Sequence, residues 1–99
     1  MDSIQIDHVS AEAALVRLID VAQSDTGQSV RVANFLLAWW NGDDLGHFAI
    51  ADLFALDRAI AIDVATIIGF LAVHPGAVYP DAFGRREEIV ALIHRREPA

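Results

Sequence analysis

Apolar residues recur at helical spacing in four segments of this 99-residue chain, and this periodicity limits the fold more than any other sequence feature. Alternation of apolar and polar residues, the pattern of a half-buried strand, never extends beyond a few positions. Short stretches with Gly, Pro, Asn or Ser, which interrupt helices, separate the segments. The sequence therefore predicts an all-α fold, a compact single-domain bundle of four helices.

The boundaries of these helices follow from capping residues and helix breakers. The expected ranges are 10–23, 28–41, 51 or 52 to 73, and 85–97. Ser10 is the expected N-cap of the first helix, and Asn41–Gly42 is a natural stop for the second. The third segment is apolar on nearly all sides, which is typical of a buried helix. We therefore expect a long third helix at the centre of the bundle.

The residues before the bundle are expected to form a separate arm. Positions 1–9 are predicted as an N-terminal arm from which Ile4, Ile6 and Val9 dock on the body, and positions 10–99 as one helical domain. The arm lacks the positive start and the apolar stretch of a secretion signal. The most apolar stretch, Ala59–Val73, is shorter than the ~20 residues of a membrane span. These features predict a cytoplasmic protein without membrane contact.

Charge and composition exclude several functional classes. The chain has 14 acidic and 7 basic residues, a formal net charge of -7, and every basic residue is Arg. It therefore lacks the positive surface with which a general nucleic-acid-binding protein neutralises phosphates. Cysteine is absent, which excludes disulfides, thiolate metal sites and cysteine nucleophiles.

The string ANFLLAWWN at Ala33–Asn41 is the most distinctive motif in the chain. Together with Gly46-His47-Phe48 and Tyr79-Pro80-Asp81, it resembles a family of short proteobacterial proteins of unknown function that are often carried on plasmids and integrated mobile elements. The likeness covers residues 27–84. This resemblance implies a fold and a bacterial origin, and it supplies no activity and no catalytic residues.

The adjacent residues Trp39 and Trp40 are the most informative pair for function. Neighbours on a helix point about 100° apart, so both are buried only where the helix is surrounded. Either Trp40 packs inward and Trp39 lies beneath the glycine-rich loop, or one ring faces a partner or a second copy. Trp is enriched among residues that dominate interface energetics. The candidate interaction residues are Trp39, Trp40, Asp43, Asp44, Phe48 and Asp52.

Metal and nucleophile motifs are incomplete in this sequence. Counted from Asn41, the loop places Asp43, Gly46 and Asp52 at positions 3, 6 and 12 of a calcium-loop spacing, but Leu45 occupies position 5 and offers no side-chain oxygen. The four histidines are far apart, and no serine lies in a Gly-x-Ser-x-Gly turn. We therefore expect no catalytic, metal or cofactor residues, and no enzyme.

Two carboxylates, Asp57 and Asp63, interrupt the apolar third segment. A buried carboxylate is costly unless it is paired, so each is expected to meet an Arg or a helix N-terminus. Arg31 and Arg58 are the local candidates, and Arg85 or Arg86 can reach from the last helix. A structural clamp between helices is the favoured role. If a carboxylate pair carries chemistry, it is this one.

Three functional hypotheses follow. The first is a small acidic, non-enzymatic interaction or regulatory protein of bacterial mobile elements, which acts by protein–protein contact. In this hypothesis the partner is another protein or a second copy of the chain, so that a homodimer forms. The second is an inhibitor of a basic nucleic-acid-binding protein, similar to anti-CRISPR or DNA-mimic proteins. The third, a carboxylate-based enzyme, has the least support. The positions of the acidic side chains distinguish the three hypotheses. Acids on one continuous face favour the inhibitor, acids scattered over the surface favour the interaction protein, and acids that converge in a cleft favour the enzyme.

Overall fold

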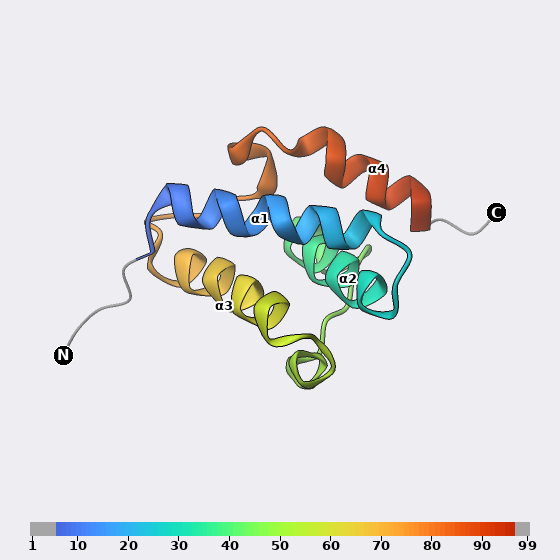
Figure 1. The fold of residues 1–99 in the computed structure, drawn as a ribbon. Coiled ribbons are helices and arrows are strands. Elements are labelled where there is room, and N and C mark those ends of the chain that lie inside the picture. The colour runs from blue at the N-terminus through green and yellow to red at the C-terminus, as the bar shows by residue number, and fades with distance from the viewer. Residues whose placement is uncertain (1–5, 97–99) are drawn as a thin grey trace.

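The computed structural model describes residues 6–96, and within this range every regular element is helical (Figure 1). The elements in chain order are α1 (His8–Gln23), α2 (Gly27–Asn41), the 3-10 helix η1 (Ile50–Ala55), α3 (Arg58–Val73), the 3-10 helix η2 (Pro80–Phe83) and α4 (Arg86–Arg96). The predicted all-α bundle with four helices is therefore confirmed.

Helix α1 lies at the centre of the bundle, between α4 on one side and α2 and α3 on the other (Figure 1). Its predicted apolar stripe is buried: Ala11, Ala14, Leu15, Leu18, Ile19 and Ala22. The expectation that the third helix is central is wrong, because α1 is the helix on which each of the other three packs.

The start of α1 differs from the predicted start at Ser10. Asp7 is the N-cap, and its carboxylate accepts a hydrogen bond of 2.7 Å from the backbone N–H of Ser10. This bond, which favours the charged carboxylate, lowers the pKa of Asp7 below its ordinary 3.8. Ile6 packs against the core as predicted, whereas Val9 is 74% exposed and does not dock. Ile4 lies outside the described residues.

The expected long third helix is interrupted before Arg58. Leu56 and Asp57 are extended, with ψ of 148° and 149°, and separate η1 from α3. Gln28 in the first turn of α2 makes two hydrogen bonds to Asp57 at this break. Its Oε1 accepts the backbone N–H of Asp57 at 2.6 Å, and its Nε2 donates to the Asp57 carboxylate at 2.9 Å. Helix α3 is therefore no longer than α1, and only one of its faces is buried.

The loop after α2 folds back along the helix from which it came. Gly46 lies directly on the α2 backbone: a Cβ there would be 2.7 Å from the carbonyl carbon of Leu37 and 2.8 Å from the Asn34 oxygen. Phe48, two residues later, packs edge-on against Phe35 with ring centroids 5.3 Å apart. Glycine is needed here because of this close approach.

Candidate interaction site

Trp39 is half-buried and makes a specific polar contact within the molecule. Its indole Nε1–H donates a 2.8 Å hydrogen bond to the carbonyl of Val78, and its ring meets the edge of Phe83 with centroids 6.4 Å apart. Of the two alternatives for the pair, the one that places Trp39 beneath the glycine-rich loop is not what the structure shows, since Trp39 packs against the segment that leads into η2. Trp39 thus connects α2 to a segment 39 residues further along the chain.

Trp40 borders an open cavity instead. The cavity has a volume of about 220 Å³ and is lined by Trp40, Tyr79 and Asp81. Trp40 comes from the last turn of α2, Tyr79 precedes η2, and Asp81 lies in its first turn. Both tryptophans pack against the core, but Trp39 is bonded to the segment before η2, whereas Trp40 also borders an open cavity that a ligand could enter.

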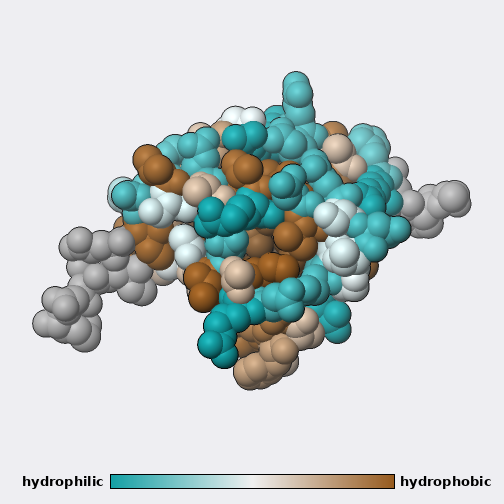
Figure 2. Space-filling view, viewed as in Figure 1, coloured by the Kyte–Doolittle hydropathy of each residue, from teal (hydrophilic) through white to brown (hydrophobic). Residues whose placement is uncertain are grey.

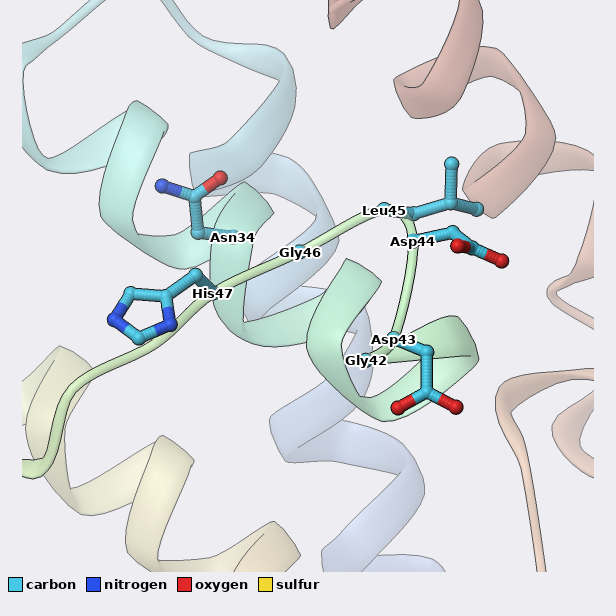
Figure 3. A pocket seen from close by; sticks show the side chains of 7 residues that line it. All are labelled: Asn34, Gly42, Asp43, Asp44, Leu45, Gly46 and His47. Atoms are coloured by element: carbon cyan, nitrogen blue, oxygen red, sulfur yellow. The ribbon is translucent and has the colours of Figure 1, made fainter.

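Asp43 and Asp44 extend from the loop after α2 and are both exposed. This loop and Asn34 line a second open cavity of about 420 Å³, together with Leu45 and His47 (Figure 3). The two carboxylates point in different directions, and both lie on the side of the loop away from Asn34 and His47 (Figure 3). They do not converge on a common point.

Asp52 lies far from this pair and has partners of its own. Its carboxylate accepts the backbone N–H of Ala49 at 3.0 Å and lies 3.7 Å from Arg31. Arg31 precedes Asn41 by ten residues, about 15 Å along a helix that rises 1.5 Å per residue. The ligands of the calcium-loop spacing are therefore not brought together. Among residues 6–96, no three His, Asp or Glu side chains form a group that could hold a metal ion.

Asp63 forms the clamp between helices that the sequence predicted, with a partner that the sequence did not indicate. Its oxygens accept two hydrogen bonds from Arg17 of α1, at 2.9 and 3.0 Å, and its side chain is nearly buried. These bonds raise the pKa of Arg17 above its ordinary range, since they favour the charged guanidinium. Asp57 pairs with Gln28 and not with Arg31 or Arg58. The two aspartates serve separate structural contacts.

Sequence reasoning missed a set of exposed apolar side chains. They lie on η1 and on the outer face of α3: Ile50, Phe54, Ile62, Ile68 and Val73. Apolar groups reach the surface at the lower edge of Figure 2, where Figure 1 places η1. The sequence signal was the apolar character of this segment on nearly all sides, which was interpreted as the mark of a buried helix. We call these five residues the η1–α3 surface.

Comparison with protein families matches residues 12–97 to a family of unknown function, DUF7673. The chain belongs to this family. The DUF7673 match includes both tryptophans, the η1–α3 surface and the lining of the Trp40 cavity. Comparisons with curated proteins and with solved structures give no match. None of the helices in the described part of the chain has the length and apolarity needed to cross a membrane.

Proposed function

We propose that this DUF7673 chain is a non-enzymatic protein-binding module that docks a partner protein through the η1–α3 surface. The observation that carries the proposal is Phe54, whose side chain is 91% exposed at the end of a short 3-10 helix. Such exposure leaves a large apolar ring in water, and contiguous apolar patches on soluble proteins mark interaction sites. Aromatic side chains are enriched in the centres of protein interfaces.

The chemistry of α3 supports the same role. Between Ala59 and Val73 its only charged residue is Asp63, which is paired with Arg17 of its own chain. Apart from Arg58, which is exposed one turn before Ile62, the outer face bearing Ile62 and Ile68 therefore offers a partner no charge that would have to be desolvated. A partner that presents apolar side chains fits this surface.

A charge-based inhibitor of a nucleic-acid-binding protein is the second candidate. Several exposed acids make no ion pair within residues 6–96, and this favours a basic partner: Asp20, Asp25, Asp43, Asp44 and Glu87. However, these acids lie on α1, on two different loops and on α4, and not along one element. Their distribution supports contact through the apolar surface over mimicry of a nucleic acid.

The setting of this function rests on the resemblance of the tryptophan-containing motif. We propose that the module works in the cytoplasm of proteobacteria, encoded on a mobile element, as a regulator of another protein. A second copy of the chain is also a candidate partner for the η1–α3 surface.

Site-specific photocrosslinking tests the proposal. A photoreactive benzoylphenylalanine replaces Phe54, and the protein is irradiated in a lysate of the source cells. The matched control carries the same group at Val9, which is also strongly exposed but lies on α1. We expect one discrete crosslinked product from position 54 and none from position 9, with competition by excess wild-type chain but not by Phe54→Ser.

The salt dependence of that product separates the two candidates. Apolar docking persists at high ionic strength, whereas binding through exposed acids is screened. A product of twice the chain mass identifies a second copy. Equal labelling from both positions, or a product that high salt abolishes, contradicts docking through the η1–α3 surface.

A further inference from the structure

The cavity beside Trp40 combines two aromatic side chains with one carboxylate, a combination that the η1–α3 surface lacks. Trp40 and Tyr79 supply the rings, and Asp81 supplies the charge. Within residues 6–96 the Asp81 carboxylate has no hydrogen-bond donor or ion-pair partner, because the only bonds at this residue involve its backbone. The cavity therefore contains an unneutralised negative charge next to aromatic faces.

The backbone that carries Tyr79 and Asp81 is held by contacts inside the molecule. The Trp39 Nε1–H bond to the Val78 carbonyl attaches the residue before Tyr79 to α2. Pro80 and Phe83, which flank Asp81 in η2, are both buried. A ligand therefore does not have to order this segment of backbone when it enters, which lowers the entropic cost of binding.

The surroundings of the cavity favour a cation. Trp40 lies at the C-terminal end of α2, where the unsatisfied carbonyl groups of a helix carry partial negative charge. Arg85, which follows η2, is already occupied by Glu88 at 3.1 Å and Glu12 at 3.9 Å.

We propose that this cavity binds the guanidinium group of an arginine side chain from another molecule. A guanidinium stacks on an aromatic face through its planar, delocalised charge and donates two parallel hydrogen bonds to one carboxylate. Trp40 and Tyr79 provide the stacking faces, and Asp81 accepts the hydrogen bonds. A lysine ammonium is more strongly hydrated and lacks the planar fork, so it fits these groups less well. The site is independent of the η1–α3 surface.

Titration with N-acetyl-arginine methylamide, monitored by NMR, tests the proposal. Each tryptophan gives its own indole N–H signal. We expect the Trp40 signal to shift and the Trp39 signal, whose N–H is bonded to Val78, to move much less. N-acetyl-citrulline methylamide has nearly the same shape without the charge, and it is expected to produce no shift. The corresponding lysine derivative is expected to bind more weakly than the arginine derivative.

Matched variants assign the effect to the cavity. Asp81→Asn removes the charge of an exposed residue and is expected to weaken binding about tenfold, as for loss of a charged hydrogen bond. Asp20→Asn makes the same change in net charge on the exposed side of α1 and is expected to leave binding unchanged. Unchanged melting temperatures establish that both variants remain folded.

Three results would each overturn the assignment. The first is no Trp40 shift at tens of millimolar probe, and the second is an equal response to the citrulline derivative. The third is equal weakening by Asp81→Asn and Asp20→Asn, which indicates attraction by net charge alone. Tighter binding of the lysine derivative would contradict the guanidinium in particular. None of these results affects docking at the η1–α3 surface, which photocrosslinking tests separately.

Discussion

At Gly46, the loop after α2 lies so close to the helix backbone that only a hydrogen atom fits between them. The neighbouring atoms belong to the backbone of Asn34, Leu37 and Ala38, and backbone atoms in a helix cannot rotate away as a flexible side chain does. A side chain at position 46 would therefore push the loop outward. Phe48 would then lose its contact with Phe35.

We expect Gly46→Ala to destabilise the fold by about 1–3 kcal/mol, the range for overpacking a close contact. Chemical denaturation followed by circular dichroism measures the loss. Gly27→Ala is the matched control, since a Cβ at Gly27 meets nothing within 4 Å and Ala favours the helix that begins there. Equal stability of the two variants would show that the loop does not depend on this contact.

Asp7 makes the start of α1 sensitive to acid. Its pKa is lowered by the bond from Ser10 N–H, so the charged form is the one that stabilises the fold. This contribution is present at neutral pH and is lost as the pH falls below 3.8 through the lowered pKa of the folded state.

The variant Asp7→Asn isolates this effect, because Asn is an equally good N-cap and does not titrate. We expect the wild type to have the higher melting temperature at pH 6, where the charged carboxylate also interacts with the helix dipole. That advantage should shrink as the pH is lowered from about 4 to about 2.5, through the lowered pKa of Asp7. A difference in melting temperature that is constant over this range would contradict the role of the charged cap.

The contacts of single residues were harder to predict from the sequence than the helices. Asp7 and Ser10 are both good N-caps, and their order along the chain does not reveal which one accepts the bond. Trp39 and Trp40 are equally apolar, and only the position of Val78, distant in sequence, decides which indole donates a hydrogen bond within the fold. The candidate site at Trp40 was thus half predicted, while Tyr79 and Asp81 were noted only as part of a motif.

At the scale of the helices, the break before α3 shows where local patterns fail. The segment from 50 to 73 contains no Pro, and its only Gly lies near the end, so its sequence reads as one helix. At the break, Asp57 is the N-cap residue of α3, and Gln28 uses both ends of its amide group to hold it. The helix stripes, in contrast, were predicted correctly because they depend only on local periodicity.

The Arg17–Asp63 pair joins α1 and α3, and its contribution can be measured by a paired substitution. We expect Arg17→Met to lower the melting temperature clearly, because it leaves the nearly buried Asp63 carboxylate without a partner. The double variant Arg17→Met/Asp63→Leu is expected to regain much of that loss, since no charge is then buried unpaired.

Thermal denaturation followed by circular dichroism measures both variants. Arg31→Met is the control, because its pair with Asp52 is longer, at 3.7 Å, and more exposed, so its loss is expected to be small. A double variant that is less stable than Arg17→Met alone would contradict this expectation. It would mean that the Asp63 side chain stabilises the contact between the two helices even without its Arg17 partner.

Across the whole molecule, the two faces of α3 have opposite roles. Val64, Ile67 and Phe70 face the core, while Ile62 and Ile68 face the solvent. The periodicity places Val64 and Ile67 on one side and Ile62 and Ile68 elsewhere, but it did not predict that the second set is exposed, because both sides are apolar. The net negative charge of the chain argued against a general nucleic-acid-binding protein, but it did not indicate where a binding surface lies.

Two substitutions two residues apart test this division. We expect Val64→Asp to unfold the protein, at a cost of about 4 kcal/mol or more, because it buries an unpaired charge. Ile62→Asp is expected to leave the fold intact, since that side chain is 56% exposed. Circular dichroism and sedimentation measure folding and association. Unfolding of Ile62→Asp, or a folded Val64→Asp, would contradict the assignment of the two faces.

The central position of α1 has a consequence for synthesis of the protein. Of the four helices, α1 leaves the ribosome first, yet its buried stripe is covered only when the helices that follow have been made. Helix α2 can close on it early, as a hairpin of sequence neighbours. The side that packs against α3 and α4 stays exposed until later residues emerge, at about 5–20 residues per second. The nascent chain therefore passes through a stage in which a chaperone and the protein's own later helices compete for the same stripe.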